Sequence, residues 1–163
     1  MLVLGLDPGT ARTGYGLVRE HTDGTLEAIA YGVFTTTPDT PTAYRLLSLY
    51  HQLNQVLLAH HPEQVAIEEL FFGKNVTTGI TVAQARGVLL LTLAQAKLPI
   101  YEYKPKTAKM TITGFGDADK HQMQEMIRQL LGLETVPKPD DAADGLAIAI
   151  THLQSTRYER LSE

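Results

Sequence analysis

The sequence contains no cysteine among its 163 residues. This absence excludes disulfide bonds and thiolate metal ligands, so any metal site must use oxygen or nitrogen donors. The first residues are apolar, but they lack a basic segment and reach Asp7 and Pro8 at once, so we expect no signal peptide. No apolar run approaches the roughly 20 residues that a bilayer-spanning helix needs. We therefore predict a cytoplasmic protein that makes no membrane contact.

Basic residues are also scarce. Fourteen Lys and Arg stand against 18 Asp and Glu, which gives a formal net charge of −4. Many nucleic-acid-binding proteins are basic, so charge alone argues weakly against a DNA ligand. The deficit matters less if several acids are metal ligands, because two divalent ions would add four positive charges locally. The remaining basic residues must then be concentrated on one face.

The length and composition are those of one globular domain. Hydrophobic residues make up 44% of the chain and charged residues 20%, which are ordinary values for a protein of this kind. No internal repeat, linker or low-complexity tract interrupts the sequence. We predict a single domain over residues 1–155 and a short C-terminal tail over residues 156–163.

Apolar spacing and turn signals predict the order of the elements. Alternating apolar residues predict strands at 2–7, 14–20, 25–35, 64–70 and 100–103. Helical spacing predicts helices over about 43–60, 77–97, 120–131 and 140–154, and Asp119 with Gln122 forms a capping-box pattern before the third. Residues 104–113 are a short basic stretch. Three strands in a meander, then strand, helix and strand, favour an α/β fold of ribonuclease H-like order, with a mixed five-stranded sheet covered by helices on both faces.

Acidic residues stand in strands, where they are costly. Asp7 ends an otherwise apolar strand beside a Pro-Gly turn, although hydrogen bonds to that turn would explain it equally well. Glu68 and Glu69 lie in the fourth predicted strand, where side chains alternate between faces and a buried carboxylate needs a partner. Periodicity alone leaves open which of these two glutamates faces a site.

Two further acids stand near the start of the last predicted helix. Asp141 and Asp144 share one helical face, with Cβ atoms about 5–6 Å apart, a spacing that suits one hard cation or a bridged pair. Taken alone, the favourable effect of the helix dipole on first-turn acids explains them better. However, the acids converge if the two strands and this helix pack side by side. Such an oxygen donor set favours magnesium or manganese over zinc.

Several motifs, which run over nearly the whole chain, together resemble the RuvC family of bacterial Holliday-junction resolvases. They are GLDPGT at 5–10, GYG at 14–16, AIEELF at 66–71, KN at 74–75, QARG at 84–87, YEY at 101–103 and DAADGLAIAITH at 141–152. The resemblance implies a ribonuclease H-like fold, a homodimer and metal-dependent cleavage of four-way DNA junctions. It also implies RuvA and RuvB, the branch-migration proteins, as partners.

The family's functional residues carry over position by position. Its four catalytic acids fall on Asp7, Glu68, Asp141 and Asp144, so the resemblance favours Glu68 over Glu69. These acids are expected to hold Mg²⁺ or Mn²⁺, two ions in each active site. Two metal ions about 3.5–4 Å apart suit in-line attack of water on a phosphate. We therefore expect 5′-phosphate and 3′-hydroxyl ends.

The resemblance also implies DNA-contact residues. Phe71 matches an aromatic residue that the family stacks on unpaired bases, although packing at the strand end would also explain it. Lys109 and Lys120 match lysines near the scissile phosphate, and this assignment depends on the resemblance alone. Three further basic candidates for DNA contact are Lys74, Lys104 and Lys106.

Symmetric cleavage of two strands requires two active sites, which a dimer supplies through its two-fold axis. The predicted helix over 77–97 is apolar on more than one face, as a helix buried between the sheet and a partner subunit would be. We therefore expect this helix to form the dimer interface.

Three other functions fit parts of the sequence. Actin-like ATPases and sugar kinases share the Asp-x-Gly-Thr turn, but they need two such domains. An RNA-processing nuclease of the YqgF type resembles the first motif, but it should lack the glutamate and paired-aspartate motifs together. A non-catalytic junction-binding scaffold would have no use for four acids.

Overall fold

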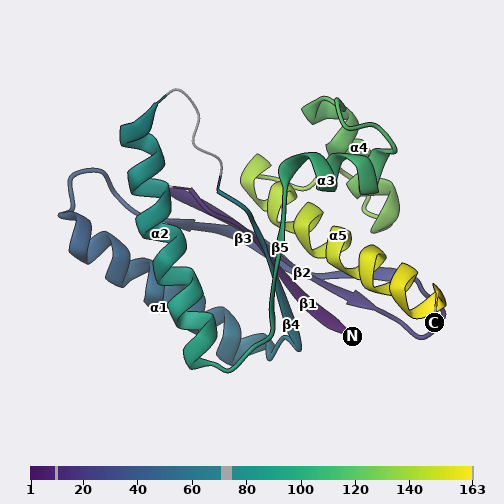
Figure 1. Ribbon diagram of the computed structural model, residues 1–163, viewed down its shortest axis with the longest axis horizontal. Coiled ribbons are helices and arrows are strands. Elements are labelled where there is room, and N and C mark those ends of the chain that lie inside the picture. The colour runs from purple at the N-terminus through teal and green to yellow at the C-terminus, as the bar shows by residue number, and fades with distance from the viewer. Residues whose placement is uncertain (10, 71–74, 163) are drawn as a thin grey trace.

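A five-stranded mixed sheet forms the centre of the protein in the computed structural model, which describes residues 1–9, 11–70 and 75–162 (Figure 1). The strand order is β3-β2-β1-β4-β5. The first three strands form an antiparallel meander, and β4 and β5 continue the sheet in parallel to β1. The predicted mixed sheet is thus confirmed. The strands are β1 (Leu2–Asp7), β2 (Arg12–Glu20), β3 (Leu26–Thr35), β4 (Gln64–Glu68) and β5 (Ile100–Tyr103).

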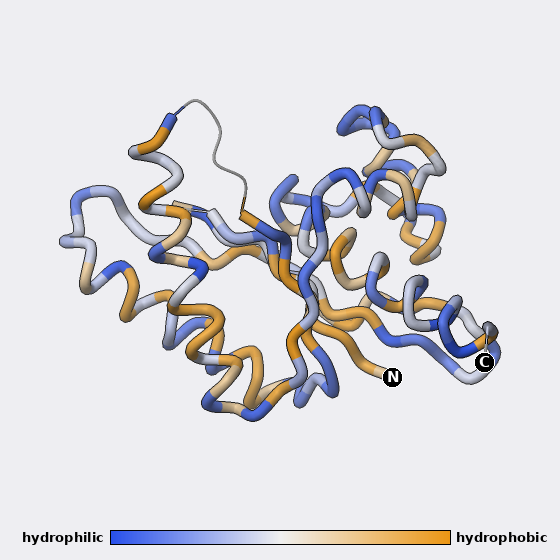
Figure 2. Tube along the Cα trace, viewed as in Figure 1, coloured by the Kyte–Doolittle hydropathy of each residue, from blue (hydrophilic) through white to orange (hydrophobic). Residues whose placement is uncertain are grey.

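Helices cover both faces of this sheet (Figure 1). On one face α1 (Thr42–His60) and α2 (Val76–Gln95) pack together. On the other face α5 (Asp140–Ser162) lies along β1 and β2, and α3 (Pro105–Thr113) and α4 (Lys120–Leu130) pack beside it. Each face therefore has its own apolar core. Figure 2 shows apolar residues concentrated in the strands and in the helix faces turned toward them.

Strand alternation assigns the residues of β1 to the two cores. Leu4 and Leu6 belong to the core beneath α1 and α2. Val3 belongs to the opposite core, beneath α5. Asp7 ends the strand with the same parity as Val3, so its carboxyl group faces the α5 side of the sheet.

Glycines let α5 lie very close to the sheet. A Cβ atom built on Gly14 of β2 would lie 1.8 Å from the carbonyl oxygen of Asp141. A Cβ atom on Gly145 of α5 would lie 2.5 Å from the carbonyl carbon of Tyr15. Real side chains cannot occupy either space, so glycine at both positions fixes the first turn of α5 against the sheet beside the end of β1.

The sequence did not predict helix α3. Pro105 stands in its first turn, where its missing N–H costs nothing, and Gly114 ends it with a left-handed φ of 79°. These are ordinary start and stop signals. The helix is short, however, and only Ala108 and Ile112 are buried, so its apolar periodicity is weak.

Helix α5 runs to Ser162, eight residues beyond the end expected at 154. The expected boundary between the domain and its short C-terminal tail, at residue 155, falls inside this helix, which continues through residues 156–162. Arg160 forms an ion pair of 2.7 Å with Glu20 at the end of β2. This contact ties the last turns of the helix to the sheet.

Helix α2 carries more apolar surface than its packing buries. By length and composition alone it could cross a membrane, contrary to our expectation, with a mean hydropathy of 1.4 over its most apolar window. The core helix of a globular protein can pass the same test. Only 28% of that window is buried, although Ala85, Leu89 and Leu93 pack into the core beneath it.

Candidate active site

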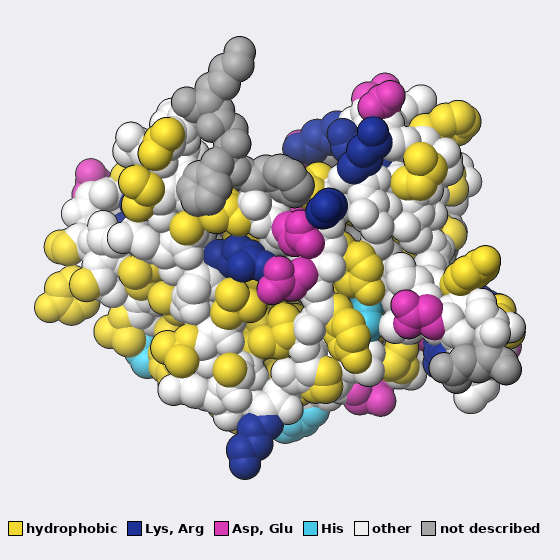
Figure 3. All heavy atoms as spheres, in the orientation of Figure 1, with side chains coloured by type: hydrophobic (Ala, Val, Ile, Leu, Met, Phe, Trp, Pro, Cys, Tyr) yellow, Lys and Arg dark blue, Asp and Glu magenta, His cyan; other side chains and the backbone are white. Residues whose placement is uncertain are grey.

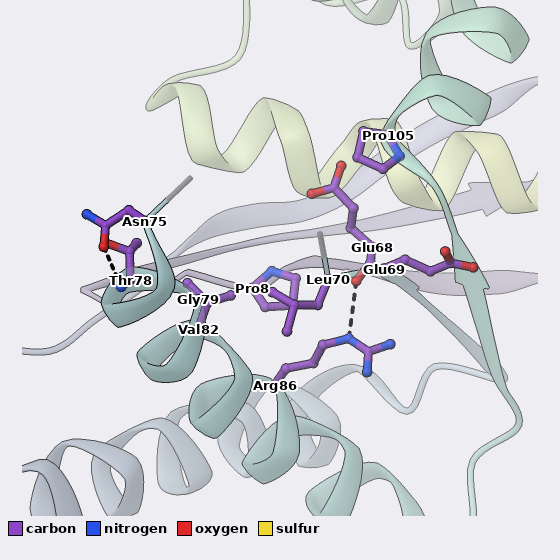
Figure 4. A pocket seen from close by; sticks show the side chains of 10 residues that line it. All are labelled: Pro8, Glu68, Glu69, Leu70, Asn75, Thr78, Gly79, Val82, Arg86 and Pro105. Carbon is purple, nitrogen blue, oxygen red and sulfur yellow. Dashed lines mark hydrogen bonds between the residues drawn. The ribbon is translucent and has the colours of Figure 1, made fainter. Parts of the chain in front are cut away.

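The alternation of β4 decides between the two neighbouring glutamates. Ile67 belongs to the core beneath α1 and α2, whereas Ala66 belongs to the core beneath α5. Glu68 is two residues beyond Ala66, so it faces α5, as Asp7 does. Glu69 follows the end of the strand, and its side chain points in another direction (Figure 4).

The structure brings together the four acids predicted from the sequence, which we call the acid quartet: Asp7, Glu68, Asp141 and Asp144. Asp7 lies at the centre, with hydrogen bonds to Glu68 and Asp144. Asp141 interacts electrostatically with both Asp7 and Asp144. The quartet thus joins the ends of two adjacent parallel strands to the first turn of α5.

Crowding of these acids changes their proton affinity. Burial, then the hydrogen bond to Glu68 and the charges of Glu68 and Asp141, together raise the pKa of Asp7 to about 9, against a lowering by the hydrogen bond to Asp144. These causes together favour the protonated form of Asp7 at neutral pH.

The two neighbours of Asp7 are shifted in the same direction. Burial and then the charge of Asp7 raise the pKa of Asp144 to about 7, although Lys120 opposes the shift. Burial also raises the pKa of Glu68, against the hydrogen bond from Asp7 and the charge of Lys109. Clefts that shift several acids in this way are typical of functional sites.

The chemistry of the quartet fits a divalent cation. Its donors are carboxylate oxygens, which Mg²⁺ and Mn²⁺ prefer, and a cation would offset both the burial and the repulsion that raise the pKa of Asp7. Within residues 1–9, 11–70 and 75–162, no three acidic or histidine side chains already stand in the arrangement of a formed metal site.

Basic residues lie beside the acids on one face of the molecule (Figure 3). Lys120 forms an ion pair of 3.2 Å with Asp140 and interacts with Asp144. The pKa of Lys120 is raised, mainly because its ammonium group donates a hydrogen bond to Asp140. Lys109 of α3 interacts with Glu68.

The other predicted DNA contacts are placed less closely. Lys104 precedes α3 and Lys106 lies in its first turn, and both are exposed. Phe71 and Lys74 lie outside the described residues, so the structure does not place them.

Two arginines next to the quartet were not predicted as site residues. Arg86 of α2 donates from Nε to the carbonyl oxygen of Glu68 at 3.4 Å and pairs with Glu102 of β5 at 2.9 Å. It lines a pocket of about 530 Å³ beside Glu68 (Figure 4). Arg12 pairs through Nε with Oδ2 of Asp141 at 2.8 Å. Arg86 was part of the QARG motif of the family resemblance, but it was given no role there. No pattern in the sequence indicated a role for Arg12.

A sheet of this order, with acids at the ends of β1 and β4 and on the first turn of α5, is typical of nucleases with the ribonuclease H-like fold. Residues 3–152 match the family model for crossover junction endodeoxyribonuclease RuvC. The chain belongs to the RuvC family of crossover junction endodeoxyribonucleases.

Individual relatives agree over nearly the full chain. The crossover junction endodeoxyribonuclease RuvC of Roseiflexus sp. (strain RS-1) is 57% identical over 149 residues, which cover 91% of this chain and 88% of that protein. The structure of Thermus thermophilus RuvC superposes with a TM-score of 0.90 at 34% identity, covering 98% of this chain and 97% of that chain. T. thermophilus RuvC in complex with a Holliday junction substrate gives 0.89 at 32% identity, over 97% and 96% of the two chains. The predicted ribonuclease H-like fold is confirmed.

Proposed function

We propose that this chain resolves four-way DNA junctions by metal-dependent hydrolysis of phosphodiester bonds at the acid quartet. The main support is the convergence of four carboxylates from three separate elements, β1, β4 and α5, at one place. A fold does not need such a concentration of unmatched carboxylates for stability, whereas a cation site does. The solved T. thermophilus RuvC bound to a Holliday junction substrate supports the choice of DNA structure.

In this proposal Asp7, Glu68, Asp141 and Asp144 are the ligands of two Mg²⁺ or Mn²⁺ ions. When bound, such ions polarise the phosphate and lower the pKa of the attacking water. Asp7 and Glu68 stand at the ends of two paired strands, so their carboxyl groups have fixed positions. These positions would in turn orient the bound ions and the phosphate. Attack of a water molecule on the phosphorus, in line with the P–O3′ bond, would break that bond and leave 5′-phosphate and 3′-hydroxyl ends.

The basic residues beside the quartet would bind the DNA backbone. Lys120 and Lys109 already interact with quartet acids, so a scissile phosphate held there lies within reach of both charges and is stabilised as negative charge develops. Lys104 and Lys106 extend this basic edge along the start of α3. We assign Phe71 and Lys74 to junction contact on the family resemblance alone.

We also propose that two copies associate through α2. Val76, Ile80 and Leu91 are 63%, 52% and 59% exposed, and helical geometry places them on one stripe with Gly87, beside which there is open space. An exposed apolar stripe interrupted by glycine suits close approach of a second helix. We expect Leu91→Glu to shift the chain from dimer to monomer in sedimentation at micromolar concentration. Leu58→Glu changes a still more exposed leucine of α1, at 72%, and should not do so. A monomeric wild type would contradict the dimer.

Partners beyond the DNA and a second copy stay predictions from the family resemblance. These partners are RuvA and RuvB, the branch-migration proteins. A cytoplasmic location also stays a prediction.

The function is tested with a labelled mobile four-way junction, a matched duplex and an RNA hairpin, each with Mg²⁺, with Mn²⁺ and with chelator. We expect paired nicks in opposing strands of the junction alone, abolished by the chelator. The nicks should carry 5′-phosphates and be religated by DNA ligase. Cleavage of RNA alone would favour an RNA-processing nuclease, and binding without cleavage under every metal would favour a scaffold.

A further inference from the structure

We infer that Arg12 is a counter-ion that holds Asp141 in the metal-free protein and becomes a phosphate ligand when a metal ion takes that carboxylate. This inference depends on the proposed function, because it assigns Asp141 to the metal. It adds a DNA-contact residue that the sequence did not indicate, and it links metal binding to DNA binding.

The position of Arg12 follows from the close packing of β2 and α5. Arg12 begins β2, and two residues later Gly14 lies against the backbone of Asp141. This contact holds the start of β2 beside the first turn of α5, so the guanidinium reaches Asp141 with a distance of 2.8 Å between Nε and Oδ2. Within the described part of the chain, it is the one basic side chain that forms a salt bridge with a quartet acid.

This ion pair is weak enough to be exchanged. The Arg12 side chain is 51% exposed and that of Asp141 is 34% exposed, and ion pairs in such positions contribute little because water and salt screen them. Lys120 and Lys138, which also lie near the first turn of α5, are already paired with Asp140. Arg12 can therefore leave Asp141 without breaking a buried contact.

A metal ion at Asp141 would change the preferred position of Arg12. The guanidinium and a divalent cation repel each other and compete for the same carboxylate oxygens. Once displaced, the half-exposed Arg12 lies at the edge of the acid site, with a planar fork that matches two phosphate oxygens. DNA then binds the freed guanidinium and prevents its return to Asp141. Metal and DNA should therefore strengthen each other's binding, as linkage requires.

The competition is tested by Mn²⁺ binding, followed through the electron paramagnetic resonance signal of free Mn²⁺, without DNA. We expect Arg12→Gln to bind Mn²⁺ about two- to fivefold more tightly than wild type, the range that corresponds to loss of one exposed ion pair. Arg19→Gln, the same charge change at an exposed position of the same strand, controls for net charge. Arg12→Lys should retain the wild-type affinity because it retains the competing charge.

The second role is tested by junction binding with Mn²⁺ in protein with an intact acid quartet, followed by stopped-flow anisotropy at times too short for cleavage. Arg12→Gln and Arg12→Lys should both weaken junction binding by about three- to tenfold relative to Arg19→Gln, because neither side chain offers the fork. An Arg12→Gln protein with the Mn²⁺ affinity and junction affinity of Arg19→Gln would overturn the inference while leaving the metal site standing. A wild type that binds no Mn²⁺ would overturn the proposed function together with it.

Discussion

Helix α5 carries two polar clusters, the acid quartet at its first turn and His152 about two turns later. His152 is fully buried, and both ring nitrogens have partners. Its Nε2 lies 2.7 Å from Oε1 of Gln64 and its Nδ1 lies 2.8 Å from the hydroxyl of Tyr103. The amide oxygen only accepts, so Nε2 carries the hydrogen and Tyr103 donates to Nδ1.

The two clusters differ in how their polar groups are matched. At His152 every donor meets an acceptor, the imidazole is neutral, and Tyr101 packs on the ring at 4.3 Å between centroids. Burial lowers the pKa of His152, which keeps it neutral. The quartet instead collects four acids of which only Asp141, among the described residues, has a salt-bridge partner, Arg12, and the pKa values of Asp7, Glu68 and Asp144 are all raised. One helix thus has a cluster that stabilises the fold and another that costs stability until it binds.

The largest effect is expected from Glu68→Gln. It removes a quartet carboxylate and should lower the rate of junction cleavage by about a thousandfold or more, within the range seen when a group acting in the transition state is lost. Glu69→Gln changes the neighbouring glutamate on the other side of the strand end and should stay within about threefold of wild type. Single-turnover cleavage of a labelled junction measures both. Equal losses in the two variants would refute the assignment of Glu68.

His152→Leu tests the matched cluster. It leaves Gln64 and Tyr103 without their buried partner, so the free energy of unfolding should fall by about 2–4 kcal/mol. Urea denaturation measures this value, and His51→Leu at an exposed position of α1 should change it little. Wild-type stability of His152→Leu would contradict a structural role for the cluster.

The pH dependence of His152 has a definite sign. Because its pKa is lowered in the folded protein, folding favours the neutral ring. Its contribution is complete above the unfolded pKa of about 6.5 and is lost as pH falls through the folded pKa. Between pH 7 and pH 5 the wild type should therefore lose more stability than His152→Leu.

Asp7→Asn tests the opposite cluster in metal-free protein. The pKa of Asp7 is raised to about 9, so its favourable contribution is present below its unfolded pKa and is lost as pH rises toward 9. Asparagine removes that loss. In chelator, thermal unfolding of Asp7→Asn should occur at a higher temperature than that of wild type at pH 8, with the difference shrinking toward pH 5. A melting temperature of Asp7→Asn below that of wild type at pH 8 would show that the Asp7 carboxyl group stabilises the metal-free fold.

The smallest effect is expected at an exposed ion pair. Arg128 holds the pKa of Glu125 down at about 2 through hydrogen bonds, and Gln129 adds to this. Both ionic partners are surface groups, where screening removes most of the gain. Glu125→Gln should leave the melting temperature unchanged within error. A large drop would mean that this surface ion pair contributes as much to stability as the buried clusters do.

The sequence alone predicted much of this arrangement. Turn signals and apolar spacing identify all five strands, and the capping box of Asp119 and Gln122 is present as expected. Asp7 was noticed at a strand end and Asp141 and Asp144 at a helix start, but the residues alone left the role of Asp7 open and favoured a helix-dipole role for the other two. Family resemblance, rather than periodicity, chose Glu68.

What the sequence left open depends on distant contacts. Glu68 and Glu69 are distinguished by the face of β4 that meets α5, and a strand covered on both sides gives no such signal. The Arg12 ion pair requires Gly14 and Asp141 to touch across the sheet, which no local pattern encodes. His152 read as one of several scattered histidines, because its partners lie on β4 and β5.

The central claim is that the quartet has more acidic groups than its neighbours can neutralise and therefore binds a cation. Proton release on metal binding tests this claim most directly. Titrating the protein with Mn²⁺ at pH 7, in buffers of different ionisation enthalpy, gives the number of protons expelled per metal-loaded chain. We expect between about one and two, from Asp7 and in part from Asp144, whose raised pKa values keep them protonated. Asp7→Asn should release about one fewer. Binding of Mn²⁺ without release of any proton would contradict the account.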